Sequence, residues 1–278
     1  MLKFEENSKG SIKDYFFFGK KLGEGAFAIV RPAKHLMTHK VFAIKTYYKL
    51  KMSDKDRQNT VDNEIKILER TEHPACIKLF DKFETRRNIH LVLEHGGEMD
   101  LKEALTLRWK GMERRITEDD GHLLRLFRSI VEGVQHLHEQ DITHNDLKLE
   151  NIVLSKEFDK PKIVDFGFGR LGSHKKMTMI CGTPNYMAPE LLAREPHFAK
   201  PCDVWALGVI FYFMLKKKFP FKGKTEVELV GDVALCDPDY KGIASYDAVN
   251  LLKSIFKVKA EERITCEEML SSIYLASV

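Results

Sequence analysis

The sequence predicts an α+β protein of two lobes, a small one built on an antiparallel sheet with one main helix and a larger, mainly helical one. Three observations predict this arrangement. Short β-like runs occupy the chain from about residue 15 to 93. A single segment among them, residues 56–70, spaces its apolar residues as a helix does. Beyond residue 97 the spacing is helical.

The small lobe has five expected strand segments. In order they read FFFGKKLG, AIVRPAKH, KVFAIKTYY, IKLFDKFE and NIHLVLEH. In the helix between them, Val61, Ile65 and Leu68 fall on one face. A glycine pair then marks a hinge. We therefore expect an N-terminal extension at 1–14 and one domain at 15–278, divided into a small lobe at 15–93, a hinge at 94–97 and a large lobe at 98–278.

Two helical segments are prominent in the large lobe. In HLLRLFRSIVEGVQHLHEQ the apolar residues form a single stripe, at positions 123, 124, 127, 130, 131, 134 and 137. The run VWALGVIFYFML at 204–215 is apolar on all sides but too short to span a bilayer. We interpret it as a buried core helix and expect no membrane partner.

Composition limits the partners and the compartment. The 278 residues carry 45 basic and 41 acidic side chains, a net charge of +4, without the long basic block that marks a nucleic-acid-binding arm. No nucleic-acid partner is expected. The five cysteines form no CxxC pair, which favours free thiols in a reducing compartment, the cytosol or the nucleus. The charged N-terminus has no apolar segment typical of a signal peptide.

The stretch LGEGAF carries glycines at a spacing that suits phosphate binding. Gly23 and Gly25 let backbone N–H groups approach phosphate oxygens, and Ala28 stands where a third glycine would complete GxGxxG. A dinucleotide-binding fold needs a helix to begin here, whereas the residues that follow are β-like. The sequence thus favours a hairpin, either for phosphate binding or an ordinary glycine-rich turn.

Lys45 ends the segment FAIK on an otherwise apolar strand. Such a lysine either extends its ammonium into water or holds an anionic ligand inside the protein. Glu64 lies on the one helix of the small lobe, where its carboxylate could position the Lys45 ammonium for a phosphate. The alternative for Glu64 is a solvated helix charge.

Four polar residues lie on two expected loops of the large lobe. Asp146, Lys148 and Asn151 fall within ITHNDLKLEN, and Asp165 follows the β-like run KIV. Two carboxylates and an amide oxygen are the ligands that magnesium prefers when it also binds nucleotide phosphates. A hydrolase with paired carboxylates is the rival interpretation, but it explains neither the glycines nor the lysines.

Together these motifs resemble the eukaryotic protein kinase family. The chain carries, in the family's order and rough spacing, Gly23-x-Gly25, Phe42-Ala43-Ile44-Lys45, Glu64, His144-Asn145-Asp146-x-Lys148-x-x-Asn151, Asp165-Phe166-Gly167, Ala188-Pro189-Glu190, Asp203-Val204-Trp205 and Arg263. The resemblance runs from about Tyr15 to Tyr274, so it implies the two-lobed protein kinase fold for 15–278 as a catalytic domain. The residues of the motifs DLKLEN and CGTPNYMAPE most resemble those of the calcium/calmodulin-dependent and AMP-activated kinase group.

The resemblance implies ATP and Mg²⁺ as cofactors and a role for each site residue. Asp146 would accept the proton of the substrate hydroxyl, Lys148 would balance charge on the γ-phosphoryl group, and Thr183 would bridge the two. Asn151 and Asp165 would bind magnesium, and Lys45, paired with Glu64, would bind phosphate. The hinge residues Glu94, His95 and Gly96, next to the gatekeeper Leu93, would contact adenine. The apolar walls around adenine would be Val30, Ala43 and Val153.

The resemblance also implies a class of acceptor. Lys148 and the segment GTPNYMAPE are typical of serine/threonine kinases, and Phe168 suggests serine over threonine. Asn145 replaces the arginine that usually receives an activation-loop phosphate, and Met179 stands at the usual phosphoacceptor position. We therefore expect activity without activation-loop phosphorylation, despite the nearby Thr178.

Two acids resemble those that bind arginine upstream of the acceptor in a protein substrate. They are Glu98 and Glu150, while Phe213 replaces a third acid of that group. This predicts a preference for a basic residue about three before the acceptor and a weaker demand at the adjacent site. The alternative is that Glu98 is a solvated surface charge. The regulatory partner is not predicted.

Other landmarks are expected to be structural. Leu68, Leu79, His144 and Phe166 match an apolar stack between the lobes, with Asp203 at its base, and Glu190 with Arg263 matches a buried ion pair. A pseudokinase, a nucleotide-binding scaffold without catalysis, is the alternative function. The presence of Lys45, Glu64, Asp146, Asn151 and Asp165 argues against it.

Overall fold

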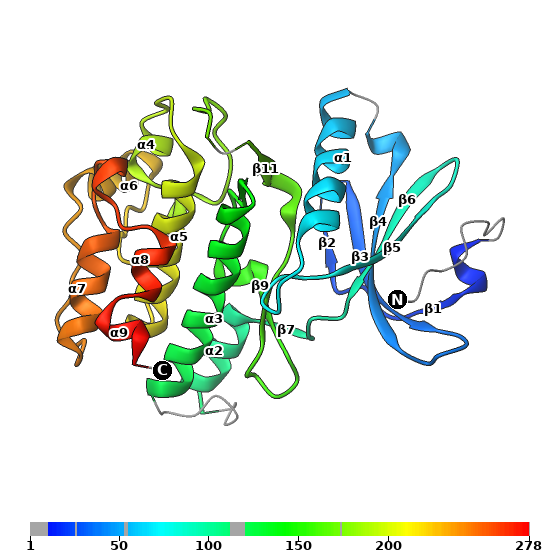
Figure 1. The fold of residues 1–278 in the computed structure, drawn as a ribbon, viewed down its shortest axis with the longest axis horizontal. Coiled ribbons are helices and arrows are strands. Elements are labelled where there is room, and N and C mark those ends of the chain that lie inside the picture. The colour runs from blue at the N-terminus through cyan, green and yellow to red at the C-terminus, as the bar shows by residue number, and fades with distance from the viewer. Residues whose placement is uncertain (1–10, 26, 53–54, 112–119, 173, 278) are drawn as a thin grey trace.

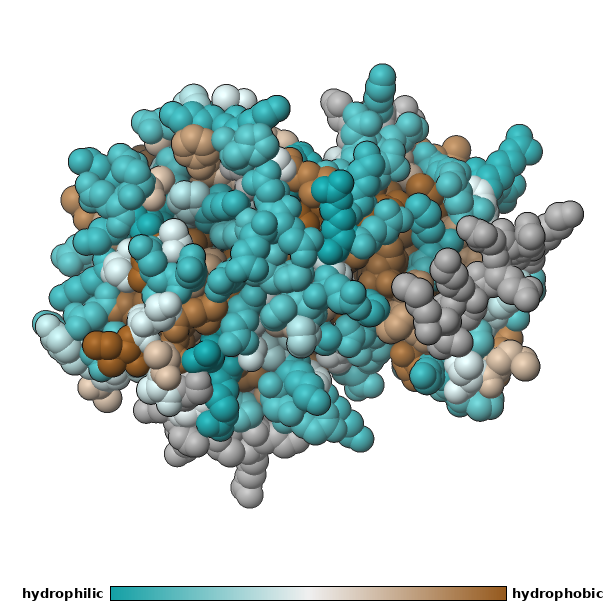
Figure 2. Space-filling view, viewed as in Figure 1, coloured by the Kyte–Doolittle hydropathy of each residue, from teal (hydrophilic) through white to brown (hydrophobic). Residues whose placement is uncertain are grey.

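The computed structural model describes residues 11–25, 27–52, 55–111, 120–172 and 174–277. The predicted extension at 1–14 therefore lies mostly outside the described residues. Figure 1 shows two lobes side by side, one with the sheet and α1 and one with the remaining helices. This is the predicted α+β arrangement. Figure 2 shows that the same face is mostly hydrophilic, with hydrophobic residues gathered over the small-lobe sheet.

The small lobe is an antiparallel sheet. Its strands are β1 (Phe16–Phe18), β2 (Gly23–Glu24), β3 (Ala28–His35), β4 (Val41–Tyr48), β5 (Leu79–Glu84) and β6 (Asn88–Glu94), in the order β1-β3-β4-β6-β5 with β2 on β3. Two short 3₁₀ turns flank them, η1 (Ile12–Asp14) and η2 (Lys49–Lys51). The run FFFGKKLG is split into two strands, because the chain leaves β3 after Gly19 and returns to it at Leu22.

The helix α1 (Lys55–Arg70) packs against the sheet and reaches the large lobe. Val61, Ile65 and Leu68 are buried, as the helical spacing predicts. Across the lobe boundary, the Asn63 amide donates to the backbone carbonyl of Gly169 at 2.6 Å. The helix thus connects the small-lobe sheet to the start of the activation segment.

The large lobe surrounds one buried helix. Its helices are α2 (Leu101–Trp109), α3 (Asp120–Glu139), α4 (Pro189–Leu192), α5 (Ala199–Lys216), α6 (Glu226–Leu235), α7 (Tyr246–Ile255), α8 (Cys266–Leu270) and α9 (Ile273–Ala276). Residues 202–214 of α5 are all buried, which explains why that run is apolar on every side. The predicted stripe of α3 is buried as well. No helix within the described ranges is long and apolar enough to cross a membrane.

Short strands between the lobes carry the loops of interest. They are β7 (Met99–Asp100), β8 (Ile142–Thr143), β9 (Ile152–Leu154), β10 (Pro161–Ile163) and β11 (Arg170–Leu171), interleaved with the 3₁₀ turns η3 (Leu149–Asn151), η4 (Phe166–Phe168), η5 (Pro184–Tyr186) and η6 (Ala260–Glu262). Antiparallel pairing of β7 with β9, β9 with β10 and β8 with β11 fixes the loop that contains Asp146 beside the loop that contains Asp165.

The Arg263 guanidinium makes a buried ion pair with Glu190. It donates to the two Glu190 oxygens at 2.9 and 3.1 Å and to the carbonyls of Pro201 and Lys257 at 2.6 and 2.9 Å, and it lies 5.1 Å above the Trp205 ring. The Arg263 side chain has no exposed surface. Burial opposes ionisation of Glu190, but Arg263 keeps the pKa of that carboxyl below its ordinary value.

Replacing Arg263 by methionine should leave the Glu190 carboxylate buried and unpaired. We expect Arg263→Met to lower the free energy of unfolding by about 3–5 kcal/mol, measured by urea denaturation. Lys259→Met is the matched control, because it removes an exposed pair with Glu262 at 3.3 Å and should cost less than about 1 kcal/mol. Equal losses in the two variants would contradict the assignment.

Candidate active site

The glycine-rich stretch forms the predicted hairpin and not the start of a helix. Gly23 pairs with Val30, and the Gly25 N–H donates to the Ala28 carbonyl at 2.9 Å. Neither glycine has a positive φ, and a Cβ atom at Gly23 would meet no atom within 4 Å. The chain's own packing therefore does not require these glycines, which favours the interpretation that they let a ligand approach the backbone.

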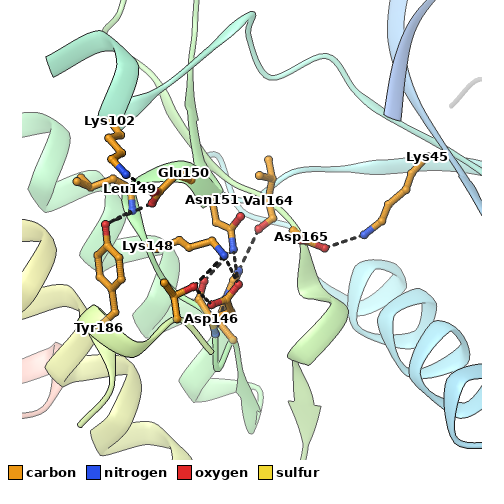
Figure 3. A network of polar contacts seen from close by, with 12 residues as sticks. Lys45, Lys102, Asp146, Lys148, Leu149, Glu150, Asn151, Val164, Asp165 and Tyr186 are labelled. Carbon is orange, nitrogen blue, oxygen red and sulfur yellow. Dashed lines mark hydrogen bonds and ion pairs between the residues drawn. The ribbon is translucent and has the colours of Figure 1, made fainter. Parts of the chain in front are cut away.

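Lys45 joins three elements of the structure. From β4, its Nζ lies 2.7 Å from the Glu64 Oε1 atom of α1 and 2.7 Å from the Asp165 Oδ1 atom of the large lobe. Figure 3 shows Lys45 and Asp165 pointing toward each other. Burial opposes the charge of Lys45, yet Glu64 and Asp165 raise the pKa of its ammonium well above the ordinary value. Lys45 is therefore a fixed cation at the lobe boundary.

Tyr47 is a member of this group that sequence reasoning missed. Its hydroxyl donates a short hydrogen bond to Glu64 Oε2, so both oxygens of the buried Glu64 carboxylate have partners. Burial raises the pKa of Tyr47, which keeps the phenol protonated as a donor. The available signal was its position two residues after Lys45 on one strand, since such residues share a face of the sheet.

Asp146, Lys148 and Thr183 form a closed network in the large lobe. Figure 3 shows the Lys148 side chain directed at Asp146. The Lys148 ammonium donates to Asp146 Oδ2 at 2.7 Å and to the Thr183 hydroxyl at 3.0 Å. That hydroxyl in turn donates to Asp146 Oδ1 at 3.0 Å. Because both carboxylate oxygens are held, Asp146 has one orientation, and the structure brings the three residues together as the sequence predicted.

Asn151 and Asp165 supply oxygen atoms suited to a magnesium ion. The Asn151 amide nitrogen donates to the Asp146 carbonyl and Oδ2 at 2.8 and 3.1 Å, so its amide oxygen is left over, with no hydrogen bond from the described residues. Asp165 is half exposed, and Lys45 beside it lowers the pKa of its carboxyl, which keeps it ionised. A neutral amide oxygen and a carboxylate fit Mg²⁺ bound together with phosphates.

The loop before Asp146 is fixed by the buried carboxylate of Asp203 on α5. It accepts the backbone N–H groups of His144 and Asn145, each at 2.9 Å, and lies 3.1 Å from the His138 ring. Asn145 has φ 63°, a conformation that costs energy for a residue with a side chain. The two hydrogen bonds to Asp203 stabilise that turn, which aims Asp146 at the lobe boundary.

His144 also orients the two loops relative to each other. Its Nδ1 accepts the Asp146 N–H at 3.2 Å, which leaves Nε2 as the donor to the Val164 carbonyl at 3.0 Å. Its ring centre lies 5.2 Å from that of Phe166, and both side chains are fully buried. His144 and Phe166 thus meet as the predicted stack requires, and the other two members lie in the same hydrophobic cluster as Phe166, Leu68 buried and Leu79 partly buried.

The predicted adenine-binding residues lie around the hinge. Ala43 on β4 pairs with Leu93 on β6, and Val30 on β3 pairs with Lys45. A Cβ atom at Gly96 would come within 2.7 Å of a Val153 methyl carbon, so the hinge backbone lies directly against that side chain. Glu94 makes an ion pair with Lys162 at 2.8 Å. Of the predicted walls, Val153 therefore lies against the hinge, Ala43 lies beside the gatekeeper Leu93, and Val30 lies beside Lys45.

The segment between Asp165 and Glu190, here called the activation segment, is anchored by backbone and side-chain contacts. Asn145 donates its amide to the Phe168 carbonyl at 3.0 Å. Met177 and His197 exchange two backbone hydrogen bonds at 2.7 and 2.9 Å. The Lys176 ammonium lies 5.6 Å from the centre of the Phe198 ring. These contacts attach the segment to the large lobe.

The two acids that are expected to bind basic residues of a substrate have different environments. The Glu98 side chain is exposed and has no ion pair or hydrogen bond within the described part of the chain. Glu150 already has an internal partner, because its Oε1 lies 2.7 Å from the Lys102 ammonium. Sequence reasoning missed Lys102, since nothing in the motif pattern indicates this pairing. Phe213 is buried.

Comparison with known proteins identifies the family. The protein kinase domain family matches residues 16–275. The chain is 34% identical over 270 residues to calcium/calmodulin-dependent protein kinase type I of Schizosaccharomyces pombe, covering 93% of this chain and 77% of that protein. It is 30% identical over 281 residues to calcium/calmodulin-dependent protein kinase type 1 of Macrobrachium nipponense, covering 98% and 78%.

A second group of relatives is much longer than this chain. Serine/threonine-protein kinase PLK4 of Drosophila virilis is 32% identical over 264 residues, which is 94% of this chain but 33% of that protein. The chain thus spans about a third of the length of these relatives. Protein kinases of this type use ATP with Mg²⁺, which agrees with the donor set of Asn151 and Asp165. The chain belongs to the eukaryotic protein kinase family, in its serine/threonine class.

Proposed function

We propose that this chain transfers the γ-phosphoryl group of Mg-ATP to a serine hydroxyl of a protein substrate. The observation that carries the proposal is the meeting of two groups at one lobe boundary. Lys45, Glu64 and Asp165 place a fixed cation and an acid on one side. Asp146, Lys148 and Thr183 place an oriented carboxylate and a second cation on the other.

The chain's own residues position and neutralise the reactants. Lys45 holds phosphate oxygens, and Glu64 keeps the ammonium in place. Asp146 accepts the proton of the acceptor hydroxyl, and Lys148 offsets negative charge on the transferred group. Asn151 and Asp165 would hold Mg²⁺. When bound, Mg²⁺ neutralises charge on the phosphates.

Replacing the proposed base or the proposed magnesium ligand should stop transfer without abolishing nucleotide binding. We expect Asp146→Asn to lower kcat by about 10²–10⁴-fold, because the amide cannot accept the proton. Asp165→Asn should act in the same direction through a weaker metal site. Labelled γ-phosphate followed into protein serine measures transfer, and a fluorescent ATP analogue measures binding.

The same assay separates the competing functions. Full transfer activity in either variant would reject the assigned roles. Label that the wild-type chain releases to water and never to protein would indicate a hydrolase, and nucleotide binding without any transfer would indicate a scaffold.

We also propose that activity does not depend on activation-loop phosphorylation. A phosphate in this segment usually needs a cluster of cations to receive it. Here the position before Asp146 is the neutral Asn145, whose amide holds the Phe168 carbonyl. The backbone pair between Met177 and His197 anchors the middle of the segment. In this proposal, these contacts hold the activation segment in place, as a bound phosphate group would otherwise do.

Thr178 is the hydroxyl residue next to Met179, the position that aligns with the usual phosphoacceptor, and it is exposed. We expect Thr178→Ala to keep kcat/KM within about twofold of wild type, since it removes no described contact. Phosphatase treatment of the wild-type enzyme should also leave activity unchanged. Loss of most activity in both experiments would contradict the proposal.

The acceptor preference rests on Phe168. This aromatic residue follows the Asp165-Phe166-Gly167 motif and is 45% exposed. We expect peptides that differ only in the acceptor to show kcat/KM roughly tenfold higher for serine, because the extra methyl of threonine would contact the ring. Phe168→Ala should narrow this ratio. Equal rates for the two acceptors in the wild-type enzyme would overturn the preference.

We propose that a basic residue about three positions before the acceptor is a second determinant of substrate specificity. The Glu98 carboxylate supports it, because it is exposed and has no partner among the residues that the structure describes, and such an acid can receive an arginine side chain. A cytosolic or nuclear location is a further proposal. It is supported by the five cysteines, which are all free thiols.

A further inference from the structure

Both oxygens of the Glu150 carboxylate have partners within this chain. Oε1 lies 2.7 Å from the Lys102 ammonium, and Oε2 accepts a hydrogen bond from the Tyr186 hydroxyl at 3.3 Å. Figure 3 shows Lys102 and Tyr186 converging on Glu150 from two sides. A substrate arginine would form its two-pronged pair with these same oxygens. Lys102 therefore occupies the place of a substrate cation.

Lys102 is held close to Glu150 by the backbone. It lies in the first turn of α2, where Asp100 caps the helix by accepting the Glu103 N–H at 2.8 Å. Burial opposes the charge on Glu150, but Lys102 lowers the pKa of that carboxyl below its ordinary value. The tether gives Lys102 a high effective concentration at the carboxylate, which a free peptide must overcome.

Tyr186 cannot easily move away from Glu150. Its side chain is buried and packs edge-on against Phe219, with ring centres 5.4 Å apart. Phe219 contacts Phe213, and Phe213 contacts Trp109. This aromatic group includes the position at which basophilic relatives are expected to have a third acid. Phe213 occupies that position, so a substrate arginine near Glu150 finds no second carboxylate there.

Glu98 provides the contrast within the same chain. Its carboxylate is exposed and lacks an internal cation among the residues that the structure describes, whereas the Glu150 carboxylate is only about one-third exposed and is already paired. One acid is open to a basic substrate residue and the other is closed.

We propose that Lys102 is a specificity-determining residue that takes the place of a substrate arginine at Glu150. As a result, the enzyme does not require a second basic residue upstream of the acceptor in its substrate. The preference for the basic residue that Glu98 binds remains. This inference rests on the proposed phosphoryl transfer to a protein hydroxyl, and it states which substrates that reaction selects.

The test uses serine peptides in which each upstream position carries either arginine or alanine. For each position we compare kcat/KM of the arginine peptide with kcat/KM of the alanine peptide. With the wild-type enzyme we expect arginine to raise kcat/KM at one position, the one whose side chain Glu98 binds. At the other positions the arginine-to-alanine ratio should lie within about twofold of one. In Lys102→Met a second position should appear, with the arginine-to-alanine ratio raised about tenfold. Lys102→Gln should behave in the same way.

Three controls connect this gain to Glu150. Lys102→Arg keeps an internal cation and should retain the wild-type ratios. Lys259→Met removes the lysine of an exposed ion pair elsewhere in the large lobe and should also change nothing. Adding Glu150→Gln to Lys102→Met should abolish the new ratio, because the neutral amide no longer attracts arginine.

The outcomes are distinct. Unchanged ratios in Lys102→Met, with normal phosphorylation of the alanine peptides, would overturn the inference while the proposed function stands. A gain that persists after Glu150→Gln would overturn it as well. Failure of the wild-type enzyme to phosphorylate any peptide would reject the proposed function, and this inference with it.

Discussion

The buried carboxylate of Asp203 is the contact on which the geometry of the site depends. It lies on α5, the helix at the centre of the large lobe, and is almost inaccessible to solvent. By accepting two backbone N–H groups of the loop before Asp146, it stabilises a left-handed residue at Asn145. A buried acid would be costly without such partners. The core of the lobe thereby sets the direction of the proposed base.

Lys45 couples the two lobes by charge. Its partners come from α1 in the small lobe and from the loop after β10 in the large lobe, so the ammonium forms both pairs only when the lobes are closed on each other. Tyr47 adds a hydrogen bond that orients Glu64. Ions held in this way contribute more to positioning a ligand than to stability, because removing them from water offsets much of their attraction.

Groups within the chain hold both the activation segment and the Glu150 carboxylate. Asn145 holds the activation segment with a neutral amide. The backbone pair of Met177 with His197 adds order to the same segment. At the substrate side, Lys102 neutralises Glu150 as a substrate arginine would. Under the two proposals, each of these tethered groups would take the place of one supplied by modification or by a substrate, since intramolecular contacts need no association step.

The sequence by itself determined the two-lobed fold and the small-lobe strands, and it predicted most of the site residues described above. Periodicity predicts which faces are buried, and residues within one motif, such as Asp146, Lys148 and Asn151, are adjacent in the chain and keep their chemistry in any context. Only the tertiary structure decided the pairs between distant groups that no motif indicates. Lys45 and Asp165 are 120 residues apart, and the partner of Glu150 comes from a helix whose pattern carries no sign of that contact. Such pairs depend on how whole elements pack, and that information is not local.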